Sequence, residues 1–321
     1  MNIENDNSSL SKDKIWIREA LSHQETEQVP YHFDFTPPAR VKLEKFYNNT
    51  LIEDKIRLPI RWGGTNTIKP LYADPKTYGK YLKDEFGVTW LLSDNDRGTP
   101  VYPSITEPDL SGYSFPDPTL NYRFENLEDW CDINKDHFRL IWAGDLWERA
   151  TFIRGMENIL LDLIQNKKFA LELLRELSDF ILKTMGIIIE RFDFEAFSLS
   201  DDYGAQNSML MSPRDWRKFI KPYLAEIIEL AKKHKKYIML HSCGNIYKIV
   251  GDLVDIGLDI LHPIQPEAMD IFKLKKEFGK DITFQGGLRT QDLLPCGTED
   301  EIMNEIRVLK ERMGKGGGYI L

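Results

Sequence analysis

Short apolar segments typical of β-strands alternate with segments of helical periodicity along most of the chain. Such alternation is typical of a parallel sheet, because neighbouring parallel strands are usually joined by a helix. The segments that we interpret as strands are 29–35, 58–62, 139–142, 196–200, 237–241, 258–261, 282–285 and 318–321. Eight strands with intervening helices predict an α/β fold, a (β/α)8 TIM barrel, with a doubly wound open sheet as the alternative.

Several of the intervening helices have clear sequence signals. Residues 13–22 form a short amphipathic pattern, and residues 168–191 carry apolar side chains at helical spacing. Ser212 followed by Pro213 is typical of a helix start, and we expect this helix to run towards His234. Thr298 and Glu301 form a capping box, which predicts a helix ending near Met313.

One long stretch interrupts the alternation. Residues 72–136 are rich in Asp, Pro and aromatic residues, and we interpret them as an insertion between the second and third strands, with a hairpin around 88–101. The polar residues 1–12 are expected to form a flexible N-terminus. Residues 13–321 then make one barrel domain, which is a usual size for this fold.

The composition excludes several classes of function. The net charge of -9 arises from acidic and basic residues mixed along the chain, with no basic stripe of the kind that binds nucleic acid. No segment approaches the roughly 20 apolar residues that span a bilayer, and the N-terminus lacks the apolar core of a signal peptide. Three scattered cysteines make no disulfide framework. We therefore expect a cytoplasmic protein that binds neither nucleic acid nor membrane.

A short motif, L-H-S-C-G-N (240–245), begins at the end of the fifth predicted strand. Side chains alternate along an extended segment, so His241 and Cys243 point to the same side. Imidazole and thiolate are both good ligands for a metal such as zinc. The alternative interpretation is a half-buried strand end with an inert thiol and a hydrogen-bonded histidine.

Polar side chains also close the neighbouring strands. Asp201 and Asp202 follow the fourth strand, His262 and Gln265 end the sixth, and Gln285 ends the seventh. The carboxyl ends of barrel strands form the face that carries chemistry in this fold, so we expect these residues to line a site. Either aspartate has a structural alternative, which is to accept hydrogen bonds from loop amides. His262 ranks below His241 as a functional residue, and His32 is interpreted as a core or rim histidine.

The motifs together resemble the uroporphyrinogen decarboxylase superfamily. The resemblance rests on H-S-C-G-N (241–245), G-D-L-V-D-I-G-L-D-I-L-H-P-I-Q-P (251–266), F-Q-G-G-L-R-T-Q-D-L-L-P-C-G-T-E-D-E-I (284–302) and G-G-G-Y-I-L (316–321), and upstream on S-D-D-Y-G (200–204). Members of that superfamily are (β/α)8 barrels. True decarboxylases carry an arginine-rich motif, R-Q-A-G-R, after the first strand. The corresponding residues 31–40 contain a single arginine, Arg40, so the chain is more similar to the corrinoid-dependent methyltransferase branch.

This resemblance implies a chemistry and a set of residues. His241 and Cys243 would bind zinc, with a third ligand beyond Leu321 or, as a weaker alternative, at Cys296. The resemblance also implies that the barrel domain, residues 13–321, lacks the extreme C-terminal segment of the family. A corrinoid would be carried by a partner protein, and the other substrate would be a small methylated compound or a thiol or pterin acceptor.

Further roles are hypotheses from position at the strand ends. Asp202 and Tyr203 are expected to be catalytic, and the residues expected to bind substrate are Asp201, Gln265, Gln285 and Tyr31. Two other functions remain open on the same barrel. One is a uroporphyrinogen decarboxylase or a related lyase, and the other is a non-catalytic partner of a corrinoid protein.

Overall fold

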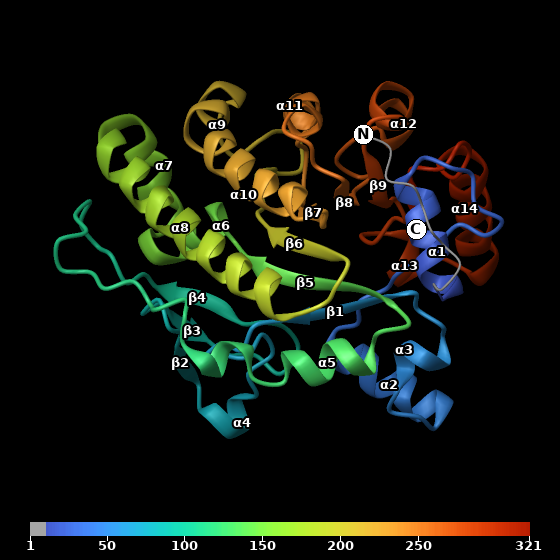
Figure 1. Ribbon diagram of the computed structural model, residues 1–321, viewed down its shortest axis with the longest axis horizontal. Helices are drawn as coiled ribbons and strands as arrows, with labels where there is room; N and C mark the ends of the chain where they lie inside the picture. The colour runs from blue at the N-terminus through green and yellow to red at the C-terminus, as the bar shows by residue number, and fades with distance from the viewer. Residues whose placement is uncertain (1–10) are drawn as a thin grey trace.

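The computed structural model describes residues 11–321, and its main feature is a curled parallel sheet. Its strands, in hydrogen-bonded order, are β1 (Ile60–Gly64), β5 (Phe138–Gly144), β6 (Ala196–Ser200), β7 (Tyr237–His241), β8 (Ile260–Ile264), β9 (Thr283–Gly286) and β10 (Tyr319–Ile320). The order follows the chain, which is the order of a barrel, whereas a doubly wound sheet reverses direction at a switch point. Figure 1 shows the strands curving in an arc with α8, α10 and α11 on its outer side.

The predicted first strand, 29–35, is not a β-strand. Pro30 has no N–H to donate, and the segment ends where Pro37 begins a helix, so little of it can join a ladder. It still extends the sheet, because Leu321 N donates to Pro30 O and His32 N donates to Leu321 O, each at 2.9 Å. The eighth position around the arc is thus held by an irregular segment.

Helices follow most strands of the curled sheet. The helices are α1 (Lys12–Leu21), α2 (Pro37–Tyr47), α3 (Ile52–Lys55), α4 (Pro75–Tyr78), α5 (Leu127–Ile133), α6 (Trp147–Arg154), α7 (Met156–Gln165), α8 (Lys167–Arg191), α9 (Pro213–Phe219), α10 (Lys221–Lys233), α11 (Val250–Asp255), α12 (Ile271–Phe278), α13 (Leu293–Cys296) and α14 (Glu299–Arg312), with 3-10 turns at Asn121–Phe124 and Tyr247–Ile249. None of the helices within residues 11–321 is long and apolar enough to cross a membrane.

Three of the helix predictions can be compared directly with the structure. The capping box of Thr298 and Glu301 is present at the start of α14. The helix expected from Ser212 to His234 is divided into α9 and α10, because Pro222 removes a backbone donor and its ring crowds the preceding turn. Residues 1–10 of the predicted flexible N-terminus lie outside the described residues, and Lys12 already belongs to α1.

The long stretch between β1 and β5 contains a second sheet. It consists of β2 (Tyr81–Lys83), β3 (Thr89–Leu91) and β4 (Thr99–Tyr102), paired antiparallel. The β3–β4 pair lies within the range where we expect a hairpin. Its connecting loop carries Arg97.

Successive side chains along each strand point to opposite faces of the curled sheet, so the buried residues form an inner core inside the curve and an outer core between the sheet and its helices. The inner core includes Ile60, Leu140, Met239 and Ile260, and α1 covers it with Ile17 and Ala20. Side chains two residues further along each strand face the same interior, nearer the carboxyl ends. Trp62, Trp142, His241 and His262 occupy this level, so polar groups lie where the fold opens to a cavity.

Candidate metal centre and cavity

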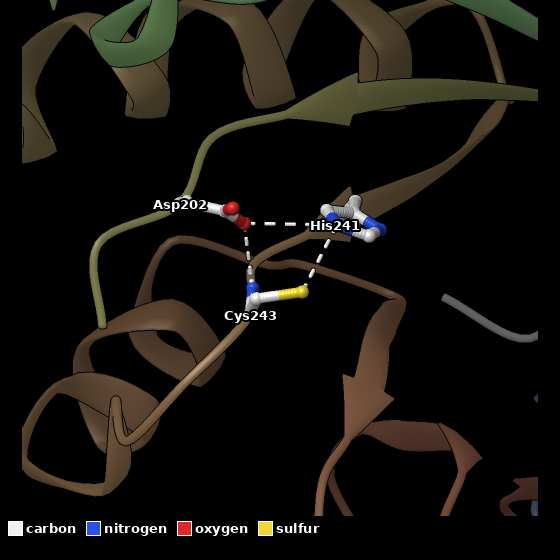
Figure 2. A group of neighbouring side chains, drawn as sticks. All are labelled: Asp202, His241 and Cys243. Carbon is white, nitrogen blue, oxygen red and sulfur yellow. Dashed lines mark hydrogen bonds and ion pairs between the residues drawn. The ribbon is translucent and has the colours of Figure 1, made fainter. Parts of the chain in front are cut away.

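Three side chains with metal-binding atoms converge after β6 and β7. His241 is the last residue of β7, Cys243 follows two residues later, and Asp202 lies in the loop after β6. His241 Nε2 lies 3.5 Å from Cys243 Sγ and 3.6 Å from Asp202 Oδ1 (Figure 2). The three ligand atoms all lie within 4.8 Å of one another.

These distances suit a single tetrahedral ion. A zinc ion with bonds of about 2.0–2.3 Å separates its ligand atoms by about 3.3–3.8 Å. Nitrogen, sulfur and carboxylate oxygen are also the donors that zinc accepts in proteins. The residues present therefore fit a zinc ion, with Asp202 in the position of the third ligand. Cys296, the weaker alternative for the third ligand, is exposed on α13 and lies outside this cluster.

The two loops that carry the cluster are fastened to each other. Cys243 N donates to Asp202 Oδ1 at 2.7 Å, and Tyr203 N donates to Ser242 Oγ at 3.1 Å. Gly244 adopts a φ of +79°, and a Cβ there would lie 2.4 Å from the carbonyl carbon of Gly204. Backbone thus packs on backbone, which holds Asp202 against the H-S-C segment.

Gln265 contributes to the same fastening. Its side-chain Oε1 accepts a hydrogen bond from Gly244 N, in the turn that follows Cys243. Sequence reasoning assigns Gln265 to substrate binding. The structure places its amide oxygen on the loop backbone, where it braces the cluster.

Burial controls the protonation of the cluster. Burial, followed by the negative charge of Asp202, raises the pKa of Cys243 to about 12, so the free side chain is a thiol at neutral pH. Burial lowers the pKa of His241, which keeps its imidazole neutral with a lone pair available. A bound divalent cation would favour the thiolate and so reverse the first of these shifts.

A second histidine supports the first. His262 Nδ1 lies 3.1 Å from His241 Nδ1, on the side of the ring opposite the cluster. Burial, followed by the neighbouring His241, lowers the pKa of His262 to about 3, so His262 is neutral. One of the two Nδ1 atoms must therefore carry the hydrogen, and a proton on His241 Nδ1 leaves Nε2 free for a metal.

Asp201 and Tyr203 are interior residues. Both are 0% exposed, and the Tyr203 hydroxyl donates to Asp201 Oδ2 at 2.9 Å. Asp201 Oδ1 also accepts from Glu148 N at 2.9 Å, at the start of α6. Burial raises the pKa of the Asp201 carboxyl well above its usual range. The pair ties β6 to α6, so neither side chain lies in the cavity where a catalytic or substrate-binding group is needed.

The remaining predicted residues are separated from one another. Gln285 is buried on β9, opposite Ile320 of the paired strand β10. Its Oε1 has no hydrogen-bond partner among the described protein atoms. The Tyr31 hydroxyl donates to Ile56 O at 2.8 Å, and Tyr31 lines a different groove with Trp16. Tyr31 is therefore placed away from the metal cluster.

A cavity of about 1190 Å³ opens at the carboxyl ends of the strands. His241 and His262 form part of its wall, so the cluster is reached through it. Its aromatic residues are Phe33, Phe35, Trp62, Tyr72, Phe86, Trp90, Trp130, Trp142, Phe152 and Phe180, and its acidic residues are Asp34, Glu53, Asp54, Asp84, Glu85, Asp145 and Glu148.

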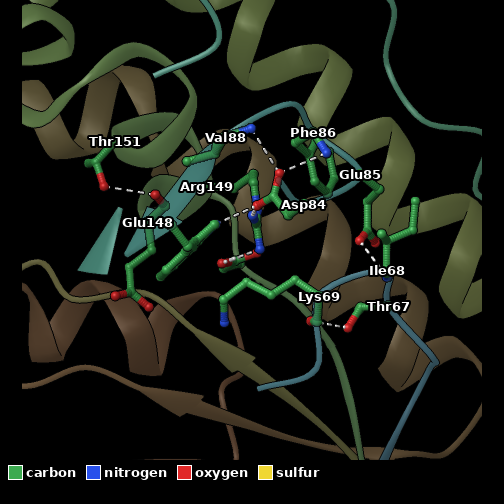
Figure 3. A network of polar contacts seen from close by, with 12 residues as sticks. Thr67, Ile68, Lys69, Asp84, Glu85, Phe86, Val88, Glu148, Arg149 and Thr151 are labelled. Carbon is green, nitrogen blue, oxygen red and sulfur yellow. Dashed lines mark hydrogen bonds and ion pairs between the residues drawn. The ribbon is translucent and has the colours of Figure 1, made fainter. Parts of the chain in front are cut away.

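Sequence reasoning missed the charged residues that the 65–137 stretch and α6 bring to this cavity. Figure 3 shows Asp84 bonded to Arg149, while the carboxylate of Glu148 points away from this pair. Glu148 Oε1 accepts from Arg97 Nη2 at 3.0 Å, and burial raises the pKa of Glu148 to about 7. The available signal was the position of Glu148 just after β5, at the carboxyl end of a strand.

Comparisons with known proteins agree with the fold. The family model described as uroporphyrinogen decarboxylase (URO-D) matches residues 142–321, more than half of the chain. A search of curated proteins finds no match. Among solved structures, a methyltransferase from Methanosarcina mazei is similar, with a TM-score of 0.72 and 16% sequence identity over 97% of this chain and 92% of that one. The chain belongs to the uroporphyrinogen decarboxylase family.

Proposed function

We propose that this protein is a zinc-dependent methyltransferase that moves a methyl group between a small substrate and a corrinoid carried by a partner protein. The observation that carries the proposal is the convergence of Asp202, His241 and Cys243 beside a cavity at the carboxyl ends of a curled parallel sheet. Membership of the family and a fold shared with a methyltransferase support this class of enzyme.

The residues present would hold zinc and leave it accessible. The Asp202 carboxylate and the Cys243 thiolate balance its two positive charges, and neutral His241 adds a third bond without further charge. When bound, zinc lowers the pKa of a substrate thiol or polarises an ether oxygen. Three protein ligands leave a position for that substrate. His262 holds the His241 ring, and Gln265 holds the loop after Cys243.

The transfer requires a partner and an acceptor. A corrinoid-binding protein would present the methyl group at the cavity, and a thiol or pterin would accept it; in the reverse direction a methylated compound would donate it. With a thiol as acceptor, the S–C bond forms as the Co–C bond breaks. The electron pair of the broken bond stays on cobalt, and the thiol proton leaves to solvent.

Decarboxylation of uroporphyrinogen is the other function found in the family, and the cavity wall argues against it. A substrate with several carboxylates needs several unpaired cations, since burying unpaired charge is costly. Arg40, the single arginine of residues 31–40, already pairs with Glu44 and Glu53. We therefore favour methyl transfer.

Metal analysis tests the proposal. Protein purified without chelators is expected to contain one equivalent of zinc, and Asp202→Asn, His241→Ala and Cys243→Ser are each expected to lose most of it. Cys296→Ser, at an exposed thiol outside the cluster, is the matched control. Zinc near zero in the unmodified protein, or equal zinc in Cys243→Ser, would contradict the proposal.

Activity provides a second test. Methylcobalamin and a small thiol are mixed with the protein, and demethylation is followed by absorbance. We expect turnover that Cys243→Ser abolishes and Cys296→Ser retains. Decarboxylation of uroporphyrinogen at an enzymatic rate, without methyl transfer, would instead support the decarboxylase.

A further inference from the structure

Most cations of the cavity wall already have polar partners within the protein. Arg149 is paired with Asp84 and Asp145, and the Lys69 ammonium donates to three backbone carbonyls. The other paired cations are Arg40 with Glu44 and Glu53, Arg61 with Asp54, and Arg123 with Glu85. These groups hold the wall together, and Arg61, Lys69, Arg123 and Arg149 are largely buried.

Arg97 is different. In the described part of the chain its guanidinium makes one ion pair, from Nη2 to Glu148 Oε1 at 3.0 Å. Its side chain is 47% exposed and lines the cavity. A guanidinium has five N–H donors, so most of those of Arg97 remain available to an oxyanion.

The backbone around Arg97 is fixed. Gly98 adopts a φ of +82°, and its N–H donates to Asp96 Oδ1 at 2.7 Å, which closes a tight turn. Lys69 Nζ donates to Arg97 O at 2.9 Å. The guanidinium lies 5.6 Å from the centre of the Phe152 ring, which supports its flat face. The β3–β4 loop therefore presents this side chain in a defined place.

Arg97 lines the same cavity as His241, whose imidazole belongs to the metal cluster. A substrate whose reacting atom reaches the cluster would thus have a cation beside its other end.

We propose that Arg97 binds an anionic group of the substrate and so selects small molecules with a carboxylate or similar oxyanion near the reacting heteroatom. Glu148 is a positioning residue, which holds the guanidinium towards the cavity. This inference rests on the proposed methyl transfer, because it assumes that the reacting atom binds at Asp202, His241 and Cys243. A charge-assisted, bidentate contact is strong enough to discriminate between substrates that differ only in this group.

Two matched probes test the assignment. Mercaptopropionate and its neutral amide have nearly the same shape and the same thiol, and differ by one negative charge. Their affinities for cobalt-substituted protein are measured by the thiolate-to-cobalt absorption band. We expect the acid to bind at least about tenfold more tightly than the amide, which is the effect of one hydrogen bond to a charged group.

Variants identify the residue responsible. Arg97→Gln is expected to remove the preference for the acid while the amide still binds, and Arg97→Lys is expected to keep part of it. Arg40→Gln, at another arginine of the wall, is expected to retain the full preference. Thermal unfolding and cobalt content of each variant show that it is folded and loaded.

The outcomes separate this inference from the proposed function. Failure of the unmodified protein to bind cobalt would overturn the metal site and the methyltransferase with it. Cobalt binding with equal affinity for acid and amide, or with neither probe bound, would overturn the role of Arg97 and leave the metal site intact. A preference that survives Arg97→Gln would assign the anion to another residue and so would also overturn the proposal.

Discussion

His241 has a different environment at each of its two ring nitrogens. Nε2 faces Cys243 and Asp202, whereas Nδ1 faces His262. The same imidazole can therefore bind a metal on one side and be oriented by a hydrogen bond on the other, which is the usual arrangement of a metal-binding histidine.

Replacing His262 by Phe is expected to weaken zinc binding about 10–100-fold, because His241 loses the partner that orients its ring. Competition with a chelator of known affinity measures this change. Replacing His32, which also lines the cavity, by Phe is the control, and its affinity for zinc is expected to change little. Unchanged affinity in His262→Phe would show that His262 has no part in orienting His241.

Zinc binding is expected to depend on pH through Cys243. Its free thiol has a pKa raised by burial to about 12, so binding must release one proton across the neutral range. The apparent affinity should then rise about tenfold for each pH unit between pH 6 and 8. A pH-independent affinity, measured by the same chelator competition, would mean that Cys243 is not a ligand.

The free energy of unfolding is expected to depend on pH through Glu148. Burial raises its folded-state pKa to about 7, above an unfolded value of about 4.5, so its contribution to stability is present at low pH and is lost as pH rises through about 7. As the pH rises from about 4.5 to about 7, the unmodified protein should therefore lose stability relative to Glu148→Gln, by up to about 3 kcal/mol. Urea unfolding at several pH values measures the difference, and a constant difference would contradict the prediction.

At the scale of elements, the loops after β6 and β7 depend on close backbone packing. Gly244 has a positive φ, and any side chain there would overlap the backbone of Gly204. The motif H-S-C-G thus ends in glycine for a structural reason, since only glycine brings the two loops together.

Gly244→Ala is expected to reduce the free energy of unfolding by at least about 2 kcal/mol, because it adds both strain and overlap. It should also lower zinc content by moving Cys243 away from Asp202. Gly186→Ala is the matched control, since Gly186 lies within α8 with open space around it, and the change should stabilise the protein by up to about 1 kcal/mol. Equal stabilities of the two variants would contradict this account of the loops.

Over the whole molecule, one buried carboxylate joins the antiparallel sheet to α6, the helix that follows β5 of the curled sheet. Asp84 Oδ1 accepts from the N–H groups of Phe86 and Val88, and Oδ2 accepts from Trp90 Nε1 and from Arg149 of α6. The wall that carries Arg97 is therefore attached to the wall that carries Glu148.

Asp84→Ala is expected to cost about 3–5 kcal/mol, because it leaves Arg149 partly uncompensated in the interior. Proteolysis is expected to cut first within residues 65–137. Asp109→Ala, at an exposed carboxylate, serves as the control and should change stability by less than about 0.5 kcal/mol. Loss of stability without faster cleavage in this stretch would show that Asp84 does not attach the second sheet.

Local sequence patterns were sufficient for most strands of the curled sheet. Residues 196–200 and 237–241 are strands as predicted, because apolar runs between helices leave little choice of structure. The prediction of a strand at 29–35 was wrong for a local reason as well, because Pro30 has no N–H to donate and a helix begins nearby at Pro37. The side on which His241 and Cys243 meet followed from their spacing alone.

The sequence by itself determined the alternation of strands and helices, the strand that ends in the H-S-C motif and the family to which the motifs are similar, because these depend on neighbours along the chain. Only the tertiary structure decided which side chains share a site. It placed Asp202 beside His241, buried Tyr203 on Asp201, and brought Arg97 from a distant loop to the cavity. Those placements depend on how strands pack side by side, and residues far apart in the chain carry no local signal of that contact.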